Sequence, residues 1–94
     1  MAEVELDELL RALSHAQRRL FVSACLPREC SAGELAELSQ LALASVSEHL
    51  KVLRKCGLLQ LEVRGRFWFY RTDRAVLRAA AAALAAIEEA SDGS

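Results

Sequence analysis

The sequence predicts a mainly α-helical protein that carries one two-stranded β-hairpin, and two observations lead to this fold class. In the first, Val46, Leu50 and Leu53 are spaced as on one buried face of a helix. In the second, residues 59–63 and 67–71 are rich in branched and aromatic side chains, with a glycine between them that is typical of a hairpin. The rest of the chain divides into further helices around these two elements.

The composition fits a single folded domain that spans residues 1–94. Hydrophobic residues make up 53% of the chain and there is one proline, which argues against a disordered protein. No apolar run approaches the ~20 residues of a membrane span. The N-terminus is acidic where a signal peptide would be basic, so we expect a cytoplasmic protein.

Capping residues and helix breakers set the bounds of the elements. Ser14 is the expected N-cap of a second helix, and Pro27 stops that helix because the residue before a proline avoids the α region. Ser31 and Glu34 have the spacing of a capping box at the start of a third helix. Gly57 follows the last turn of the fourth helix, where glycine is common. The predicted helices span residues 3–13, 16–26, 32–38, 43–56 and 74–90, and the hairpin spans 59–71.

The last predicted helix, capped by Thr72 or Asp73, contains an apolar run over residues 79–87. A helix that is apolar all round is normally buried, and a domain of this size cannot surround one by itself. The alternative is an exposed alanine-rich helix that is stabilised by propensity alone. We expect a homodimer, because such a patch would otherwise remain exposed to water. The residues expected at its interface are Leu6, Leu9, Leu10, Leu77, Ala80, Leu84 and Ile87.

The charges of the chain are unevenly distributed, although its net charge is only −1. Residues 51–78 carry eight Lys or Arg residues against two acids. A basic face of this kind is the electrostatic footprint of a nucleic-acid-binding protein, whereas ordinary solvated charge is the alternative.

The predicted helices 32–38 and 43–56 are joined by a short turn, an arrangement in which the second helix can lie in a DNA major groove. Arginines at the hairpin tip would then hold phosphates. Double-stranded DNA is therefore the expected partner. The candidate DNA-binding residues are Leu43, Ala44, Ser45, Ser47, Glu48, Lys51, Lys55, Arg64 and Arg66.

Several short motifs follow one another at fixed spacing. They are LSHAQRR at residues 13–19, GELAE at 33–37, VSEHLKVLR at 46–54, GLL at 57–59 and GRFWFYR at 65–71. In this order they resemble the ArsR/SmtB family of small dimeric winged-helix repressors, over about residues 6–90. The resemblance implies a winged helix-turn-helix of five helices and a two-stranded wing, with the first and last helices forming the dimer. It also implies repression at an operator until an inducer, often a metal or metalloid, releases the protein.

The known sensing sites of that family do not carry over to this chain. Ser31 and Gly33 stand where some members have a Cys-x-Cys pair, and residues 74–91 contain neither His nor Cys. Ser23 stands where sulfide-sensing members have a cysteine of the second helix. We therefore predict no cofactor and no metal site of the family type. The chain also has Ala42, Leu43 and Ala44 where members usually have a polar run entering the recognition helix.

The three cysteines are Cys25, Cys30 and Cys56, an odd count that argues against a disulfide framework in a cytoplasmic protein. Packed thiols are the favoured interpretation, because burial is the usual state of free cysteine. The alternative is a thiol sensor that binds a soft metal or metalloid or becomes oxidised. That alternative depends mainly on Cys30, which is expected to be exposed just before the third helix, where the helix N-terminus would lower its pKa.

Other functions find less support in the sequence. With two histidines, both on predicted helices, no catalytic constellation can be assembled, so we predict that the protein is not an enzyme. His49 is expected to be a packed, hydrogen-bonded histidine. A protein-interaction module with the same fold, using the apolar Leu43 and Ala44 face, remains the alternative to a DNA-binding repressor.

Overall fold

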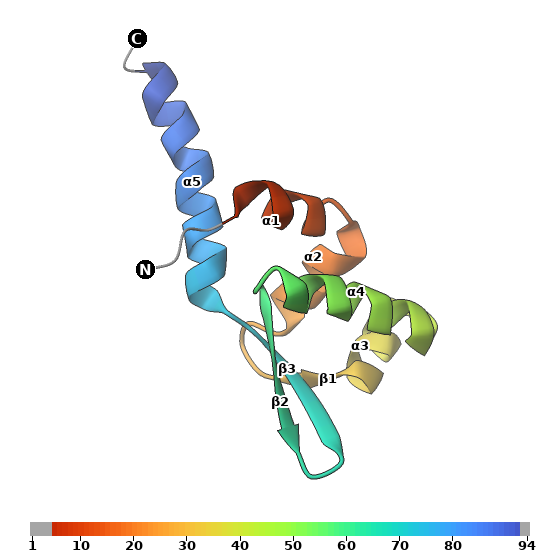
Figure 1. Cartoon of the computed structure of the whole chain (residues 1–94). Coiled ribbons are helices and arrows are strands. Elements are labelled where there is room, and N and C mark those ends of the chain that lie inside the picture. The colour runs from red at the N-terminus through yellow and green to blue at the C-terminus, as the bar shows by residue number, and fades with distance from the viewer. Residues whose placement is uncertain (1–4, 93–94) are drawn as a thin grey trace.

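The computed structural model describes residues 5–92, with side chains described to residue 90, and it has five helices and three short strands (Figure 1). The elements are α1 (Leu6–Ala12), α2 (Ala16–Ala24), β1 (Cys30–Ser31), α3 (Ala32–Ser39), α4 (Leu43–Lys55), β2 (Leu59–Arg64), β3 (Phe67–Thr72) and α5 (Arg74–Asp92). The predicted mainly helical winged fold with five helices is confirmed. The first helix begins at Leu6 rather than residue 3, and residues 3 and 4 lie outside the described residues.

The capping residues that start α3 and α5 behave as their types predict. The Ser31 hydroxyl accepts a hydrogen bond from the Glu34 N–H at 3.1 Å, and the Glu34 carboxylate accepts one from the Ser31 N–H at 2.9 Å. Of the two candidates for α5, Asp73 is the cap, since its carboxylate accepts from the backbone of Ala75 and Val76. Both helices are therefore started by local side-chain chemistry.

The prediction that Ser14 caps α2 is wrong. The N-cap of α2 is His15, and it makes no side-chain capping bond. The Ser14 hydroxyl instead donates to the Arg11 carbonyl at 2.7 Å, at the end of α1. Serine can satisfy a carbonyl of the preceding helix as readily as an N–H of the next one, and the sequence alone does not distinguish the two.

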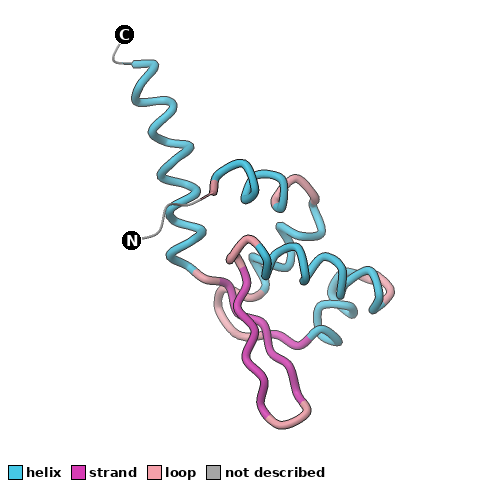
Figure 2. Tube along the Cα trace, in the orientation of Figure 1, coloured by secondary structure: helices cyan, strands magenta, loops and turns pink. Residues whose placement is uncertain are grey.

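The predicted hairpin is found as β2 and β3, and the short strand β1 extends it to a three-stranded antiparallel sheet (Figure 2). Strand β1 pairs with β3, placing Cys30 opposite Tyr70 and Ser31 opposite Phe69. A strand of two residues is too short to produce a recognisable alternation in the sequence. This pairing ties the wing to the start of α3. It also buries Cys30, whose side chain was expected to be exposed.

A buried hydrogen bond joins the end of β3 to α2. Thr72, at the end of β3, donates its hydroxyl to the Val22 carbonyl at 2.7 Å, and its N–H donates to the Cys25 carbonyl at 3.0 Å. Val46, Leu50 and Leu53 of α4 are buried in the core, as predicted. The base of the wing is therefore fixed to the helices that carry α4.

Helix α5 extends away from the rest of the molecule, on the side opposite the tip of the hairpin (Figure 1). Its first half packs against α1, and Ala80 and Leu9 are buried there within one chain. Farther along, Leu84 is 46% exposed and Ile87 is 59% exposed. The apolar face left open on α5 is thus narrower than the sequence predicted. Within residues 5–92, no helix combines the length and the apolar character needed to cross a membrane.

Candidate nucleic-acid interface

Helix α4 presents one side to solvent because its other side is anchored in the core. Val46, Leu50 and Leu53 are each at most 1% exposed, which fixes the rotation of the helix. The predicted contact residues of this helix all lie on its exposed surface: Leu43, Ala44, Ser45, Ser47, Glu48, Lys51 and Lys55. The helix ends at Lys55, and Gly57, two residues farther on, has a left-handed φ of +87°. The exposed side of α4 is therefore free to contact a partner along the length of the helix, as a recognition helix does.

The wing turns through Gly65 and Arg66, the two residues between paired Arg64 and Phe67. Gly65 has a φ of +63°, which favours glycine at the first central position of a tight hairpin turn. A Cβ at this position would meet nothing within 4 Å, so the glycine serves the backbone conformation rather than a close contact. Arg66 is exposed at the tip and, among the described residues, takes part in no ion pair.

Arg64 differs from Arg66 in its ion pairs, although the sequence predicts a phosphate contact for both. Its guanidinium pairs with the carboxylates of Glu29 and Glu62, the latter at 3.3 Å, and lies 4.1 Å from the centre of the Phe69 ring. The hydrogen bond to Glu29 is the main reason that the pKa of Arg64 is raised. Because two carboxylates already neutralise it, Arg64 is a weaker candidate for a phosphate contact than Arg66.

A hollow of about 400 Å³ separates α4 from the wing. Its α4 side carries Ser47, Lys51 and Arg54, and its wing side carries Trp68 and Tyr70. Leu43 and Ala32 complete its lining. The recognition helix and one face of the wing therefore open onto the same space.

Arg54 and Trp68 belong to this surface but were not among the predicted contact residues. Arg54 lies at the edge of the polar face of α4 and within the basic segment, so charge alone could have identified it. Trp68 shares a strand face with Tyr70, which is buried, while Phe67 and Phe69 lie on the other face. The alternation was visible in the sequence, but the face that turns toward α4 was not.

His49 belongs to α4, and its ring packs against residues at the start of and within α2. Its ring centre is 5.9 Å from that of His15 and 6.2 Å from that of Phe21. Burial, and then the nearby charge of Arg18, lowers the pKa of His49, which favours the neutral imidazole. The predicted packing is found, although no side-chain hydrogen bond to His49 occurs among residues 5–90. Within the same residues, no three His, Cys, Asp or Glu side chains form a group that could hold a metal ion.

Cys25 and Cys30 lie side by side in the core rather than on the surface. The Cys30 thiol is 3.6 Å from the Ala24 carbonyl oxygen, and Cys30 is only 4% exposed. Burial and the adjacent Cys30 thiol raise the pKa of Cys25 to about 12. Cys56, at the end of α4, is half-buried, and burial raises its pKa as well. The expectation that the Cys30 side chain is exposed is therefore wrong.

Comparison with known proteins matches residues 8–60 to the bacterial regulatory proteins of the arsR family. An ArsR-like transcriptional regulator from Rhodococcus sp. RHA1 is 30% identical, with 94% of this chain and 83% of that chain covered and a TM-score of 0.84. Reduced HlyU from Vibrio cholerae N16961 is also 30% identical, covering 73% and 74% of the two chains at a TM-score of 0.67. The transcriptional repressor SdpR of Bacillus subtilis (strain 168) is 25% identical over 73 residues, which are 78% of this chain and 81% of that protein.

The family match covers α2, α3 and α4, which include the helix-turn-helix and the exposed surface described above. The structural match to the Rhodococcus regulator extends over the wing and α5 as well. The chain belongs to the arsR family of bacterial regulatory proteins, which are DNA-binding transcription regulators and not enzymes.

Proposed function

We propose that this chain is a transcriptional repressor that acts as a homodimer on an operator. In each protomer α4 lies in the major groove of the DNA and the wing lies along the DNA sugar-phosphate backbone. The observation that carries the proposal is the shared hollow, because it places Ser47 and Lys51 of α4 beside one face of the wing. SdpR, a repressor of similar length, supports the direction of regulation.

Base reading falls to the short polar side chains of α4 in this arrangement. Ser47 can contact a base edge or a phosphate, and the carboxylate of Glu48 can accept a hydrogen bond from cytosine N4. Lys51 lies 4.0 Å from Glu48, and both side chains are about three-quarters exposed. An exposed pair of this kind is weak, so either group can exchange its partner for DNA. Two such helices in successive major grooves would lie ~34 Å apart.

Selection of bound duplexes from random DNA tests this reading directly. The wild-type protein is expected to enrich one motif. Ser47→Ala or Glu48→Ala is expected to reduce the discrimination between bases at one position of that motif by ~1–3 kcal/mol, so that the preferred base there changes. Arg78→Ala, an exposed change on α5, is the control and should leave the motif unchanged. If no duplex is enriched, a protein-interaction module using exposed Leu43 becomes the better proposal.

Arg66→Ala is expected to lower the salt dependence of operator binding by about one unit of the logarithmic slope, because one phosphate contact is lost. Arg64→Ala should change the slope less, since Glu29 and Glu62 already neutralise that guanidinium. Operator affinity measured by fluorescence anisotropy over a range of salt concentrations gives both slopes. A slope that stays the same in Arg66→Ala would exclude a phosphate contact at the wing tip.

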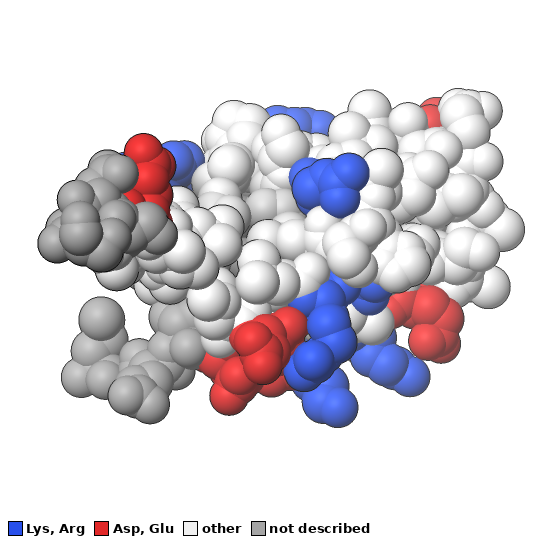
Figure 3. Space-filling model, turned by 90° about the horizontal axis from the view of Figure 1, so that it is seen from above, with Lys and Arg blue, Asp and Glu red and all other residues white. Residues whose placement is uncertain are grey.

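The homodimer is supported by the apolar side chains that a single chain leaves uncovered on α5. Leu84 and Ile87 are exposed and three residues apart, so they lie on the same side of α5. Leu10 of α1 is 40% exposed. Seen from above, charged side chains gather mainly along one edge of the molecule, and much of the rest of the visible surface carries no Lys, Arg, Asp or Glu (Figure 3). Such a surface suits a second copy of this chain better than DNA.

A thiol-reactive or metalloid inducer is the proposed signal for release. The support is the adjacency of Cys25, at the end of α2, and Cys30, in the strand that pairs with the wing and precedes α3. An oxidant that removes two electrons and two protons would join the two sulfurs, and trivalent arsenic would bridge them. Either link would displace β1 and with it the wing. Burial slows both reactions, because the thiolate is the reactive form.

Operator affinity measured with and without oxidant or trivalent arsenic tests this signal in the wild type and in Cys30→Ser. The operator affinity of the treated wild type is expected to fall at least tenfold over hours. Cys30→Ser should keep its affinity, because it lacks one of the two thiols that the link requires. Cys56→Ser, which leaves the adjacent pair intact, is the matched control and should respond like the wild type. Equal affinities under all conditions would leave the cysteines as packing residues.

A further inference from the structure

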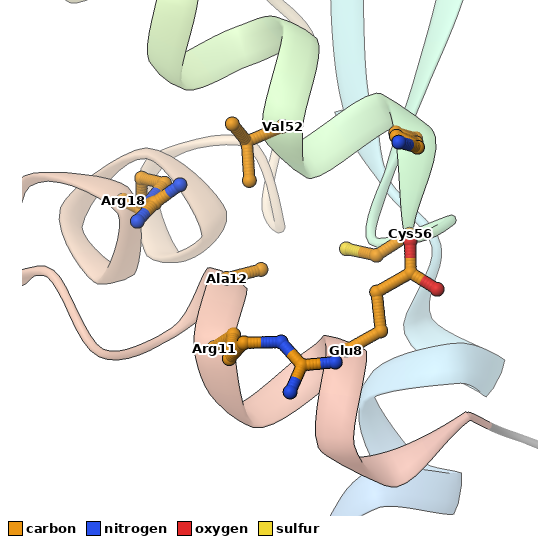
Figure 4. A pocket seen from close by; sticks show the side chains of 7 residues that line it. Glu8, Arg11, Ala12, Arg18, Val52 and Cys56 are labelled. Atoms are coloured by element: carbon orange, nitrogen blue, oxygen red, sulfur yellow. The ribbon is translucent and has the colours of Figure 1, made fainter.

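A second cavity lies between α1, α2 and the C-terminal end of α4 (Figure 4). Its volume is about 260 Å³, close to the lower limit of ~300 Å³ for small-molecule sites. It is lined by Glu8, Arg11, Ala12, Arg18, Val52, Lys55 and Cys56. In Figure 4, Arg18 and Cys56 lie on opposite sides of the space, with Ala12 and Val52 between them.

Arg18 is the feature of this cavity that needs an explanation. It is only 7% exposed, and its Nε has no hydrogen-bond partner. Within the described part of the chain, its guanidinium also takes part in no ion pair. A buried charge without a partner is strongly destabilising, so proteins normally pair it. An anion in the cavity would supply the missing partner.

The other charged side chains around the cavity favour the same sign of ligand. Arg11 and Lys55 add two cations to Arg18, against the single carboxylate of Glu8. No ion pair joins any of the four to another described residue. The lining therefore carries an excess of positive charge in a partly enclosed space, where electrostatic attraction is stronger than at an open surface.

The uncharged part of the lining restricts the ligand further. Ala12 and Val52 present methyl groups, and the Cys56 thiol, a weak donor, already donates to the Leu53 carbonyl oxygen at 3.4 Å. A bare inorganic ion would leave these walls in contact with water, whereas a ligand with a short hydrocarbon part would cover them. A DNA phosphate does not fit this role, because Arg18 is buried beneath the surface that a duplex could reach.

We propose that this cavity binds a small organic anion whose carboxylate or phosphate accepts hydrogen bonds from Arg18 and whose short apolar part contacts Ala12 and Val52. Because α4 forms one wall and α1 another, a ligand in the cavity contacts both α4 and the helices that support it. The ligand thereby alters operator affinity, and this last step rests on the proposed function, whereas binding itself does not.

Titration of the ¹⁵N-labelled protein with butyrate, butyl phosphate and inorganic phosphate tests the site by NMR. Butyrate or butyl phosphate is expected to give saturable shifts for residues that line the cavity, and inorganic phosphate weaker ones. Arg18→Gln should weaken binding at least tenfold, since a hydrogen bond to a charged group is lost. Glu8→Gln removes the opposing carboxylate and should tighten binding. Arg78→Gln loses the same charge outside the cavity and is the control.

The opposite results would overturn the proposal. One is the lack of saturable binding of any probe to the wild type at about 10 mM. Another is equal affinity in folded Arg18→Gln and the wild type. Should Arg18→Gln fail to fold, Arg11→Gln and Glu8→Gln decide the matter, because their side chains are not buried and they must shift affinity in opposite directions.

Operator affinity with and without the tighter probe tests the regulatory step separately. A change in the wild type that is absent in Arg18→Gln supports it, and an unchanged affinity overturns that step. Saturable binding at the cavity stands as a result even if the chain bound no operator. Failure of the site and failure of the proposed function are therefore distinguishable.

Discussion

Leu84→Glu is expected to convert the proposed homodimer into a monomer that remains folded. Leu84 is 46% exposed in the single chain, so a glutamate there can stay hydrated while the protomer is alone. In a dimer joined through α5 the same carboxylate would be buried without a partner, at a cost of ~3–5 kcal/mol per copy. That cost weakens association by more than a hundredfold.

Sedimentation at several protein concentrations measures the change, and circular dichroism shows whether the helices persist. Ala82→Glu places the same charge on the opposite, exposed side of α5 and should leave the dimer intact. An intact Leu84→Glu dimer would mean that the interface lies elsewhere. A charge at Ala80 is not an equivalent test, because Ala80 is buried against α1 within one chain and the substitution would unfold the protomer.

The parts of the fold that the sequence predicted are those determined by neighbouring residues. The start of α3 depends on Ser31 and Glu34, three residues apart, and the end of α4 depends on Gly57 and its positive φ. The buried face of α4 follows from helical periodicity, which also fixes which side faces a partner. Local chemistry determines these features, so the recognition helix can be placed from the sequence alone.

Features that depend on distant contacts could not be predicted in this way. Arg64 is neutralised by Glu29, which is 35 residues away, and this pair exists because β1 joins the sheet beside the wing. That same pairing buries Cys30 and reverses the expectation of an exposed thiol. The cavity around Arg18 likewise combines three helices, and the motif that contains Arg18 gave no sign of an unpaired charge.

The buried position of Cys25 leads to an expected loss of stability at alkaline pH. Its pKa is raised from the ordinary value of 9.0 to about 12 in the folded chain, chiefly by burial and then by Cys30. Above pH 9 the unfolded chain releases the thiol proton while the folded chain retains it. The unfolded state then binds fewer protons, so the free energy of unfolding falls as the pH rises.

The contribution of Cys25 is therefore complete below pH 9 and is lost as the pH approaches 12. The decline is on the order of a few kcal/mol in total. Urea unfolding at a series of pH values from 8 upward measures it, and the wild type should lose stability faster than Cys25→Ala, whose cavity penalty does not depend on pH. Cys56→Ala is the matched control, since that half-buried thiol has a smaller burial effect to lose. Parallel curves for the wild type and Cys25→Ala would mean that the Cys25 thiol ionises as readily in the folded chain as in the unfolded one, and such a thiol would be reactive enough for rapid sensing.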